Sequence, residues 1–209
     1  MVVQALENPI ISDDLIKIYK NDSQFIVDVG EADVYVNFEI NGIKYYRTTN
    51  ENGTAKMAIN LNPGNYTIKT SYCDTTVENM VTVLPTLMAN NLLKYFGNES
   101  HFYVTLIDGT CRPVSGVNIT MNINGVFYNR TTDENGSAKL NIWLNPGDYI
   151  LTACDPLTGL MMSYNITVLD VLNASDLNMT YLDGSQFEVS VLDGQGNKLA
   201  NATVTFNIN

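Results

Sequence analysis

The strongest constraint on the fold of this chain is an internal repeat. The segment Asp14–Phe25 aligns without a gap with Asn91–Phe102 and with Asp176–Phe187, at offsets of 77 and then 85 residues. Self-similarity at a fixed spacing indicates one structural unit copied along the chain, each copy with its own core or stacked on its neighbours. The architecture is therefore a tandem array.

Further blocks recur in the same order and set the domain boundaries. Val34–Ile43 matches Val117–Val126, and Thr48–Lys56 matches Thr131–Lys139. The four predicted parts are residues 1–13, 14–86, 87–171 and 172–209. The first is the end of a preceding repeat or a leader strand, the next two are complete repeats, and the last is the first half of a third. Ends that are out of phase with the repeat are typical of a piece of a longer array.

Each repeat has the pattern of β-strands. The apolar residues Val34, Val36, Phe38 and Ile40 alternate with Tyr35, Asn37 and Glu39. This is the two-residue period of a strand with one apolar face. Asn41-Gly42 then predicts a hairpin, because a type I′ turn needs two residues with positive φ. Seven strands are predicted in the first repeat, at Leu15–Tyr19, Phe25–Val29, Val34–Ile40, Ile43–Thr49, Thr54–Leu61, Tyr66–Ser71 and Asn79–Val83. The predicted fold class is all-β: tandem immunoglobulin-like β-sandwiches of about seven strands each.

Two tyrosines are predicted to have a structural role. Tyr66 and Tyr149 each follow an Asn-Pro-Gly turn and open the penultimate strand of their repeat. A tyrosine corner occupies this place in immunoglobulin-like sandwiches, and its hydroxyl bonds to upstream backbone. We expect both rings to be largely buried and both hydroxyls to be hydrogen-bonded.

The turn motifs resemble a known family. Thr131–Leu140 with Asn145–Tyr149, and Val191–Phe206, look like the immunoglobulin-like repeats of adhesin-like surface proteins of methanogenic archaea. Invasin-type repeats and pilin-type B domains are similar in pattern. The resemblance covers nearly the whole chain and implies display on the cell surface as a stalk or spacer, with adhesion to other cells as a further role.

The pilin-type pattern also implies a cross-link between a first-strand lysine and a last-strand asparagine. Lys17 and Lys94 occupy the same position of the first strand. Asn79 and Asn165 are one register apart, so they face opposite ways. We therefore favour lysines that lean over a strand edge, and keep the cross-link as an alternative.

The sequence predicts no catalytic, cofactor-binding or metal-binding residue. The one histidine, His101, is replaced by Gln24 and Gln186 in the other repeats, so a histidine-dependent nucleophile or a histidine-ligated metal is not supplied. Asp133-Glu-Asn135-Gly136 is interpreted as a turn, since the ligands that a calcium loop needs further on are absent. Calcium at Asp170 and Asp176 stays an alternative. The chain is predicted not to be an enzyme.

Charge and hydropathy exclude two classes of partner. The formal net charge is −11 and no Lys/Arg cluster is present, so a phosphate backbone is repelled and nucleic-acid binding is not expected. The longest uncharged apolar run, Val81–Asn91, contains Pro85 and is too short to span a bilayer, so no membrane insertion is expected in this segment. The expected partners are the neighbouring repeats and a protein or glycan at a cell surface.

Asparagine usage indicates a glycosylated exterior, whereas the cysteines cannot form a complete internal disulfide framework. Cys73, Cys111 and Cys154 are odd in number and are expected to be buried or half-buried thiols. Eleven Asn-x-Ser/Thr sequons predict a glycosylated exterior. They lie at Asn21, Asn52, Asn65, Asn98, Asn118, Asn129, Asn135, Asn165, Asn173, Asn178 and Asn201.

Two functional hypotheses follow. In the first, the repeats are non-catalytic spacers of an adhesin-like protein; in the second, they bind a protein or glycan on another cell themselves. The similar turns of the repeats favour the spacer, and the inserted loop Asp108–Pro113 is the best candidate for a binding surface. The half-repeat carries an apolar face with Phe206 and lacks a partner sheet. We expect it to be poorly ordered, or to pack on the second repeat or on a neighbouring molecule.

Overall fold

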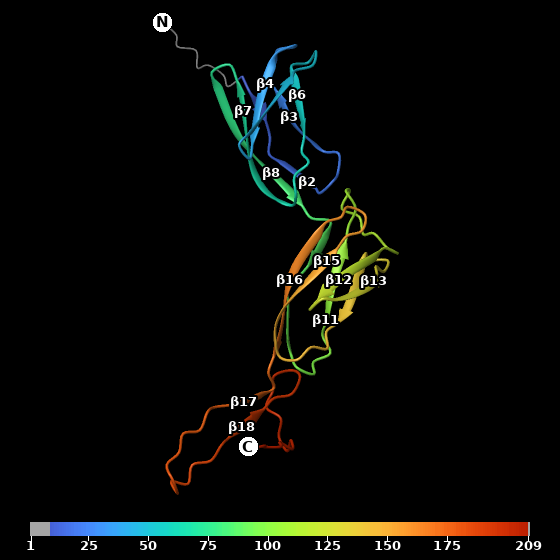
Figure 1. The fold of residues 1–209 in the computed structure, drawn as a ribbon. Helices are drawn as coiled ribbons and strands as arrows, with labels where there is room; N and C mark the ends of the chain where they lie inside the picture. Colours follow the sequence, from blue (N-terminus) through green and yellow to red (C-terminus); the bar gives the residue numbers. More distant parts are fainter. Residues whose placement is uncertain (1–8, 209) are drawn as a thin grey trace. The chain divides into compact units, whose positions relative to one another are not determined.

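The computed structural model describes residues 9–208, and every regular element in that range is a β-strand. The chain divides into two compact units, coloured from blue to red along the chain in Figure 1. Among the described residues, the first unit contains residues 9–86 together with Ile107–Arg112. The second contains Leu87–Leu106 and the chain from Pro113 onward.

The first unit is a two-sheet sandwich. One sheet has the order β1-β3-β6, formed by Ile11–Ser12, Gln24–Asp28 and Thr54–Ala58. The other has the order β2-β8-β7-β4-β5, formed by Leu15–Ile18, Thr75–Leu84, Gly64–Tyr72, Tyr35–Ile40 and Ile43–Thr48. The inner faces of both sheets are apolar, and side chains from the two faces form one core.

Alternation along the strands produces this core. Val36, Phe38 and Ile40 of β4 are buried, as the two-residue period predicts. Phe25 of β3 reaches across from the other sheet and meets Phe38 edge to face, with ring centroids 6.0 Å apart and an interplanar angle of 89°. Burying each ring contributes about 2–3 kcal/mol, so this pair is a principal element of the core.

The second unit contains a sandwich with the same topology. One sheet has the order β14-β11-β9, formed by Ser137–Asn141, His101–Leu106 and Leu87–Ala89. The other has the order β10-β16-β15-β12-β13, formed by Leu92–Tyr95, Met161–Leu169, Gly147–Cys154, Asn118–Ile123 and Val126–Thr131. Its core is separate from that of the first sandwich. The expected fold class, tandem immunoglobulin-like sandwiches, is confirmed.

The first strand of each of the first two repeats is divided between the two sheets, which the sequence did not reveal. β1 pairs with β3, whereas β2 pairs in parallel with β8. Ile10 lies in the core, so the first sandwich begins before residue 14, the predicted start. Asp14 follows the crossing point, and its Oδ1 accepts a hydrogen bond from Met80 N at 2.8 Å. Residues 1–8 of the predicted leader segment lie outside the described residues.

The third repeat begins in the same way as the other two. β17 (Leu172–Ala174) pairs with β18 (Val189–Val191), and Asn173 faces Ser190 as Met88 faces Thr105 in the second repeat. Phe187 and Phe206 meet edge to face at 5.9 Å and 85°, close to the geometry of the Phe25–Phe38 pair. Their exposed fractions are 47% and 55%, because no strand among residues 9–208 covers them. Residues 176–208 contain one regular strand, β18, and an isolated bridge between Leu192 and Lys198.

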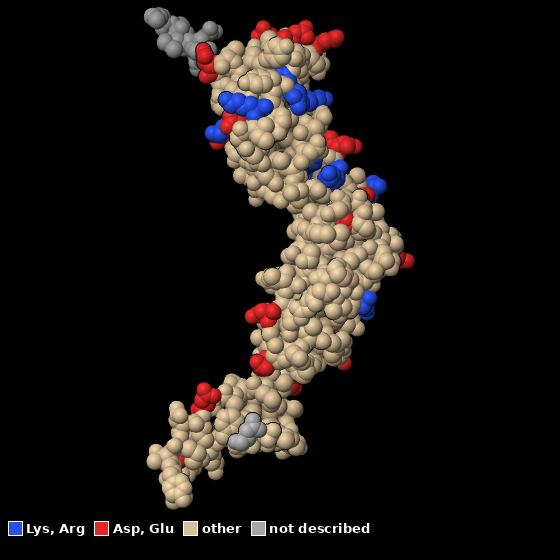
Figure 2. Space-filling view, in the orientation of Figure 1, with Lys and Arg blue, Asp and Glu red and all other residues tan. Residues whose placement is uncertain are grey.

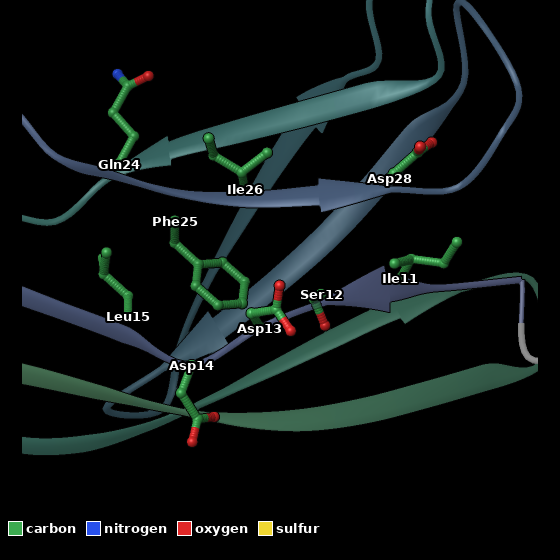
Figure 3. Close-up of a pocket in the computed structure, with 9 residues that line it drawn as sticks. All are labelled: Ile11, Ser12, Asp13, Asp14, Leu15, Gln24, Phe25, Ile26 and Asp28. Atoms are coloured by element: carbon green, nitrogen blue, oxygen red, sulfur yellow. The ribbon is translucent and has the colours of Figure 1, made fainter.

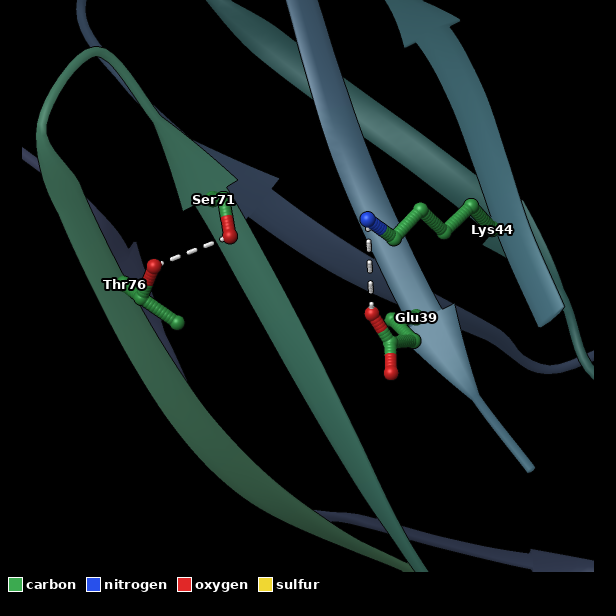
Figure 4. A network of polar contacts seen from close by, with 4 residues as sticks. All are labelled: Glu39, Lys44, Ser71 and Thr76. Atoms are coloured by element: carbon green, nitrogen blue, oxygen red, sulfur yellow. Dashed lines mark hydrogen bonds and ion pairs between the residues drawn. The ribbon is translucent and has the colours of Figure 1, made fainter. Parts of the chain in front are cut away.

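The outer faces of the sheets mix polar side chains with exposed apolar ones. In the first sandwich, Lys44 Nζ lies 3.9 Å from a Glu39 carboxylate oxygen, and Ser71 and Thr76 share a hydrogen bond of 2.9 Å (Figure 4). Such exposed cross-strand pairs add little stability. Figure 2 shows acidic and basic groups interspersed over the displayed face of the first sandwich. These faces are solvated surface rather than a built site.

Candidate functional site

A cavity lies where the first strand crosses between the sheets of the first sandwich. It has a volume of about 410 Å³ and is lined by Ile11–Leu15, Gln24–Ile26 and Asp28 (Figure 3). The corresponding residues 173–177, 186–188 and 190 of the third repeat line a cavity of about 380 Å³. The first and third repeats thus share a cavity lined by equivalent positions.

Asp14, one of the acidic residues that line this cavity, has a structural role. Asp14 accepts the Met80 N–H, and in the second repeat Asn91 Oδ1 accepts the equivalent Asn165 N–H at 2.8 Å. A neutral amide therefore replaces the carboxylate in the same hydrogen bond. The position needs an acceptor and does not need a charge or a general base.

The most unusual buried groups are the first-strand lysines. Lys17 is only 4% exposed, and its Nζ donates hydrogen bonds to Asn21 O at 2.8 Å, Ser23 O at 3.1 Å and Ile59 O at 2.8 Å. Burial lowers the pKa of Lys17, and the charge of Asp22 partly opposes this effect. The ammonium thus ties the turn after β2 to the segment after β6.

Lys94 has the same role in the second sandwich. It is 6% exposed, and its Nζ donates to Ser100 O at 3.3 Å and Ile142 O at 3.0 Å. The ammonium also lies 5.7 Å from the centroid of the Trp143 ring. Burial lowers the pKa of Lys94. The favoured expectation, a lysine leaning over a strand edge, is therefore wrong: both side chains enter the sandwich because backbone carbonyls satisfy the ammonium there.

The register of the strands bears on the predicted cross-link. The last-strand residues opposite the two buried lysines are Val83 and Val168. Asn79 lies four residues before Val83, about 13 Å along the strand, and its Oδ1 accepts a hydrogen bond from Ser12 Oγ. Asn165 is exposed and three residues before Val168. This arrangement argues against a lysine–asparagine cross-link.

The two tyrosine hydroxyls make the bond expected of a corner. Tyr66 Oη donates to Asn62 O, and Tyr149 Oη donates to Asn145 O, each at 2.8 Å. Both rings are half-buried rather than largely buried. The reason is that each ring lies over the glycine of its Pro-Gly turn at the edge of the sandwich, where a Cβ on Gly64 would come within 3.3 Å of the Tyr66 hydroxyl.

The inserted loop Asp108–Pro113 is not peculiar to the second repeat. Ile107–Arg112 belongs to the first unit, where Asn21 Nδ2 donates to Gly109 O at 3.2 Å. The third repeat has the same turn at 192–197, and within the second unit Asn98 Nδ2 donates to Gly194 O at 2.6 Å. The 85-residue match between Ile107–Arg112 and 192–197 was the sequence signal for this shared element.

The carboxylates of the turn aspartates accept hydrogen bonds from backbone N–H groups. Asp108 Oδ1 accepts from Thr110 N and Arg112 N, and hydrogen bonding, first from Arg112 N–H, lowers the pKa of Asp108. Asp133 Oδ1 accepts from Asn135 N and Ser137 N, each at 2.9 Å, as a turn residue does. No cluster of three or more metal-ligating side chains is found among the described residues.

The cysteines and the sequons are mostly at the surface. Cys73 and Cys111 are exposed and Cys154 is half-buried, so the expectation of buried thiols is wrong for two of the three; Cys73 and Cys111 lie in turns with positive φ. Of the eleven sequon asparagines, nine are exposed, whereas Asn21 and Asn98 are half-buried.

A shallow pocket on the outer face of the second sandwich has a different character. It has a volume of about 460 Å³ and is lined by Tyr103, Arg130, Thr131, Asp133, Ser137 and Lys139. Tyr103 is 53% exposed and its ring meets that of His101 at 6.2 Å. An exposed aromatic ring beside two cations, two hydroxyls and one carboxylate, that of Asp133, can bind a ligand with a flat apolar face and acidic groups, because the cations outnumber the carboxylate.

No known family model matches the sequence, and no characterised protein sequence matches it. Among solved structures, the chain is similar to a chimeric titin Z1Z2-Z1Z2 tandem, with 15% identity, 76% of this chain and 95% of that chain covered, and a TM-score of 0.33. It is also similar to the I9–I11 tandem of titin, with 17% identity, 92% of this chain and 82% of that chain covered, and a TM-score of 0.39. A third similar structure is invasin, a bacterial integrin-binding protein, with 16% identity, 93% of this chain and 47% of that chain covered, and a TM-score of 0.32. These likenesses concern the fold alone. Among the described residues, no helix is long and apolar enough to cross a bilayer.

Proposed function

We propose that this chain is a non-catalytic, load-bearing spacer of an extracellular adhesin-like protein, built from immunoglobulin-like repeats with boundaries near residues 86 and 171. The observation that carries the proposal is the pairing of the terminal strands. β2, near the start of the first sandwich, lies parallel to β8, its last strand. β10 and β16 are paired in the same way in the second sandwich.

Parallel terminal strands resist tension along the chain. When the two ends of a sandwich are pulled apart, β10 is drawn backwards and β16 forwards along a common axis. The evenly spaced hydrogen bonds of a parallel pair are then loaded together in shear, instead of being broken one after another. Four residue pairs share this load, from Leu92–Ile166 to Tyr95–Leu169. This property suits a segment that holds a binding domain away from a cell.

Other features support display at a cell surface. Nine exposed sequons suit a glycosylated exterior. The turn motifs Thr131–Leu140 and Asn145–Tyr149 resemble those of adhesin-like proteins of methanogenic archaea, which supports an archaeal origin. None of the recurring polar groups in the cavity at the strand crossing or in the turns requires a catalytic role.

Pulling single molecules of the 209-residue chain tests the spacer. Phe96 N donates to Leu169 O at 2.9 Å, next to the β10–β16 pair. Phe96→Pro removes this donor, and we expect a lower unfolding force for the second sandwich while the first sandwich keeps its force. The unfolding rate under load is the quantity that changes.

Leu93→Pro is the matched control. Leu93 is 67% exposed, and its N–H faces away from β16, since successive N–H groups of a strand point to opposite sides. Its unfolding force is expected to stay close to that of the wild type. Equal losses in both variants, or low forces in the unaltered chain, would contradict a load-bearing role for these strands.

The pocket beside Tyr103 favours a second function, direct adhesion through an acidic carbohydrate. The ring offers a face for a sugar, and Arg130 and Lys139 offer partners for a carboxylate. An array of neutral and uronic-acid-containing glycans, probed with the purified chain, distinguishes the two functions. Binding of acidic glycans that is lost in Arg130→Ala with Lys139→Ala supports adhesion, whereas no binding, or binding that survives this change, rejects this pocket.

A further inference from the structure

The turn after β10 is held by the third repeat through one side-chain amide. Asn98 Nδ2 donates to Gly194 O at 2.6 Å, while Asn98 Oδ1 accepts from Ser100 N at 2.7 Å. The approach is close: a Cβ on Gly194 would lie 3.1 Å from Asn98 N. Gly196 packs on the Tyr95 ring, where a Cβ would come within 2.4 Å of a ring carbon. Both segments of this contact lie within the second unit.

The same contact occurs in the first unit. Asn21 Nδ2 donates to Gly109 O at 3.2 Å, and Asn21 Oδ1 accepts from Ser23 N at 3.2 Å. A Cβ on Gly109 would lie 3.0 Å from Asn21 Cβ. Two copies of one arrangement, 77 residues apart at the asparagine and 85 apart at the glycine, show that it is part of the repeat. We call each of them a clasp.

Both clasp asparagines are the first residue of a sequon. N-glycosylation transfers a sugar from a lipid-linked oligosaccharide to Nδ2: the sugar–phosphate bond breaks, the lipid phosphate leaves, and the sugar replaces one of the two hydrogens of the atom that each clasp uses as its donor. These are also the two half-buried members of the eleven sequon asparagines. A sugar ring on Nδ2 needs the volume that the backbone of Gly109 or Gly194 fills.

We propose that glycosylation of Asn21 and Asn98 and closure of the clasps are mutually exclusive, so that each of these two sequons is a modification site that controls whether a turn docks. In the folded chain the two sequons resist modification while the exposed ones accept it. A sugar added before folding keeps the corresponding turn, 108–112 or 193–197, undocked. The inference does not depend on the spacer function.

Enzymatic glycosylation of the folded, unmodified chain tests this directly. The purified chain is treated with an oligosaccharyltransferase and its lipid-linked oligosaccharide, and the occupancy of every sequon is measured by glycopeptide mass spectrometry. Occupancy at Asn98 and Asn21 is expected to be about tenfold lower than at the exposed Asn118, because a clasp of one hydrogen bond keeps the open form scarce. Equal occupancy at all three sites overturns the proposal.

Two glycine variants provide a crossed control. Gly194 and Gly109 have backbone angles that any residue adopts, so Gly194→Val and Gly109→Val strain only the clasp. Gly194→Val is expected to raise occupancy at Asn98 and leave Asn21 unchanged, and Gly109→Val to do the reverse. Low occupancy at Asn98 that persists in Gly194→Val shows that the clasp is not what protects the sequon, and also overturns the proposal.

Protein made in a secreting, glycosylating host tests the converse. Its sequons meet the enzyme before folding, and Ser100→Ala supplies the same chain with Asn98 but without the sequon. Trypsin is expected to cleave after Lys198, beside the 193–197 turn, faster in molecules glycosylated at Asn98 than in Ser100→Ala. Equal cleavage rates mean that the sugar leaves the clasp closed, which contradicts the proposal whatever the first experiment gives.

Discussion

Replacing Lys17 by methionine is expected to destabilise the first sandwich by about 2–3 kcal/mol, because it leaves the carbonyls of Asn21, Ser23 and Ile59 without their shared donor. Methionine fills a similar volume and stands at the equivalent position of the third repeat, as Met179. The loss therefore reports the missing hydrogen bonds rather than a cavity. Chemical denaturation followed by far-ultraviolet circular dichroism measures it.

The chain supplies the controls for this experiment. Lys56→Met makes the same change of charge at an exposed position of β6, and is expected to change stability by less than about 0.5 kcal/mol. Trp143, the one tryptophan, lies in the second sandwich, so the midpoint of its fluorescence transition should stay unchanged in Lys17→Met. Equal midpoints for Lys17→Met and Lys56→Met would show that water satisfies the three carbonyls.

The strand pattern was largely predictable because it is local. Alternation in Val34–Ile40, the Asn-Gly hairpin turns and the aligned repeats place the strands of both sandwiches to within a few residues. The apolar residues named from that alternation, Val36, Phe38 and Ile40, are buried as expected. The repeat makes the prediction of strand positions more secure, since one assignment of strands has to fit both copies.

What the sequence did not reveal depends on partners distant along the chain. Ile11–Ser12 carries no alternation long enough to show a strand, and it joins β3 only because the chain crosses between sheets at Asp13–Asp14. Lys17 looks like an edge lysine, yet one of its acceptors, Ile59 O, lies 42 residues away. The clasp is hidden for a different reason: the first repeat lacks the insertion of the second, and only the alignment of residues 107–112 with 192–197 of the third repeat reveals the shared turn.

Gly136→Ala is expected to cost the second sandwich about 3 kcal/mol or more. Gly136 has a φ of +69°, and a Cβ there would lie 2.5 Å from Leu106 O and 3.0 Å from Val114 N. Left-handed backbone costs an alanine about 1–2 kcal/mol. The remainder arises because the Cβ meets backbone atoms that hydrogen-bond to each other, Val114 N to Leu106 O at 3.0 Å, and these cannot move without breaking that bond.

Gly125→Ala separates the two contributions. Gly125 has a φ of +76° and open space where its Cβ would stand, so alanine there meets the backbone strain alone. Its cost should be about 1–2 kcal/mol. Trp143 fluorescence during denaturation measures both variants in the same sandwich. A gap of about 2 kcal/mol between them means that the turn at Gly136 is closed against β11 by direct backbone contact. Similar costs would mean that this turn gives way, and that the Asn-Gly motif is required there only for its φ.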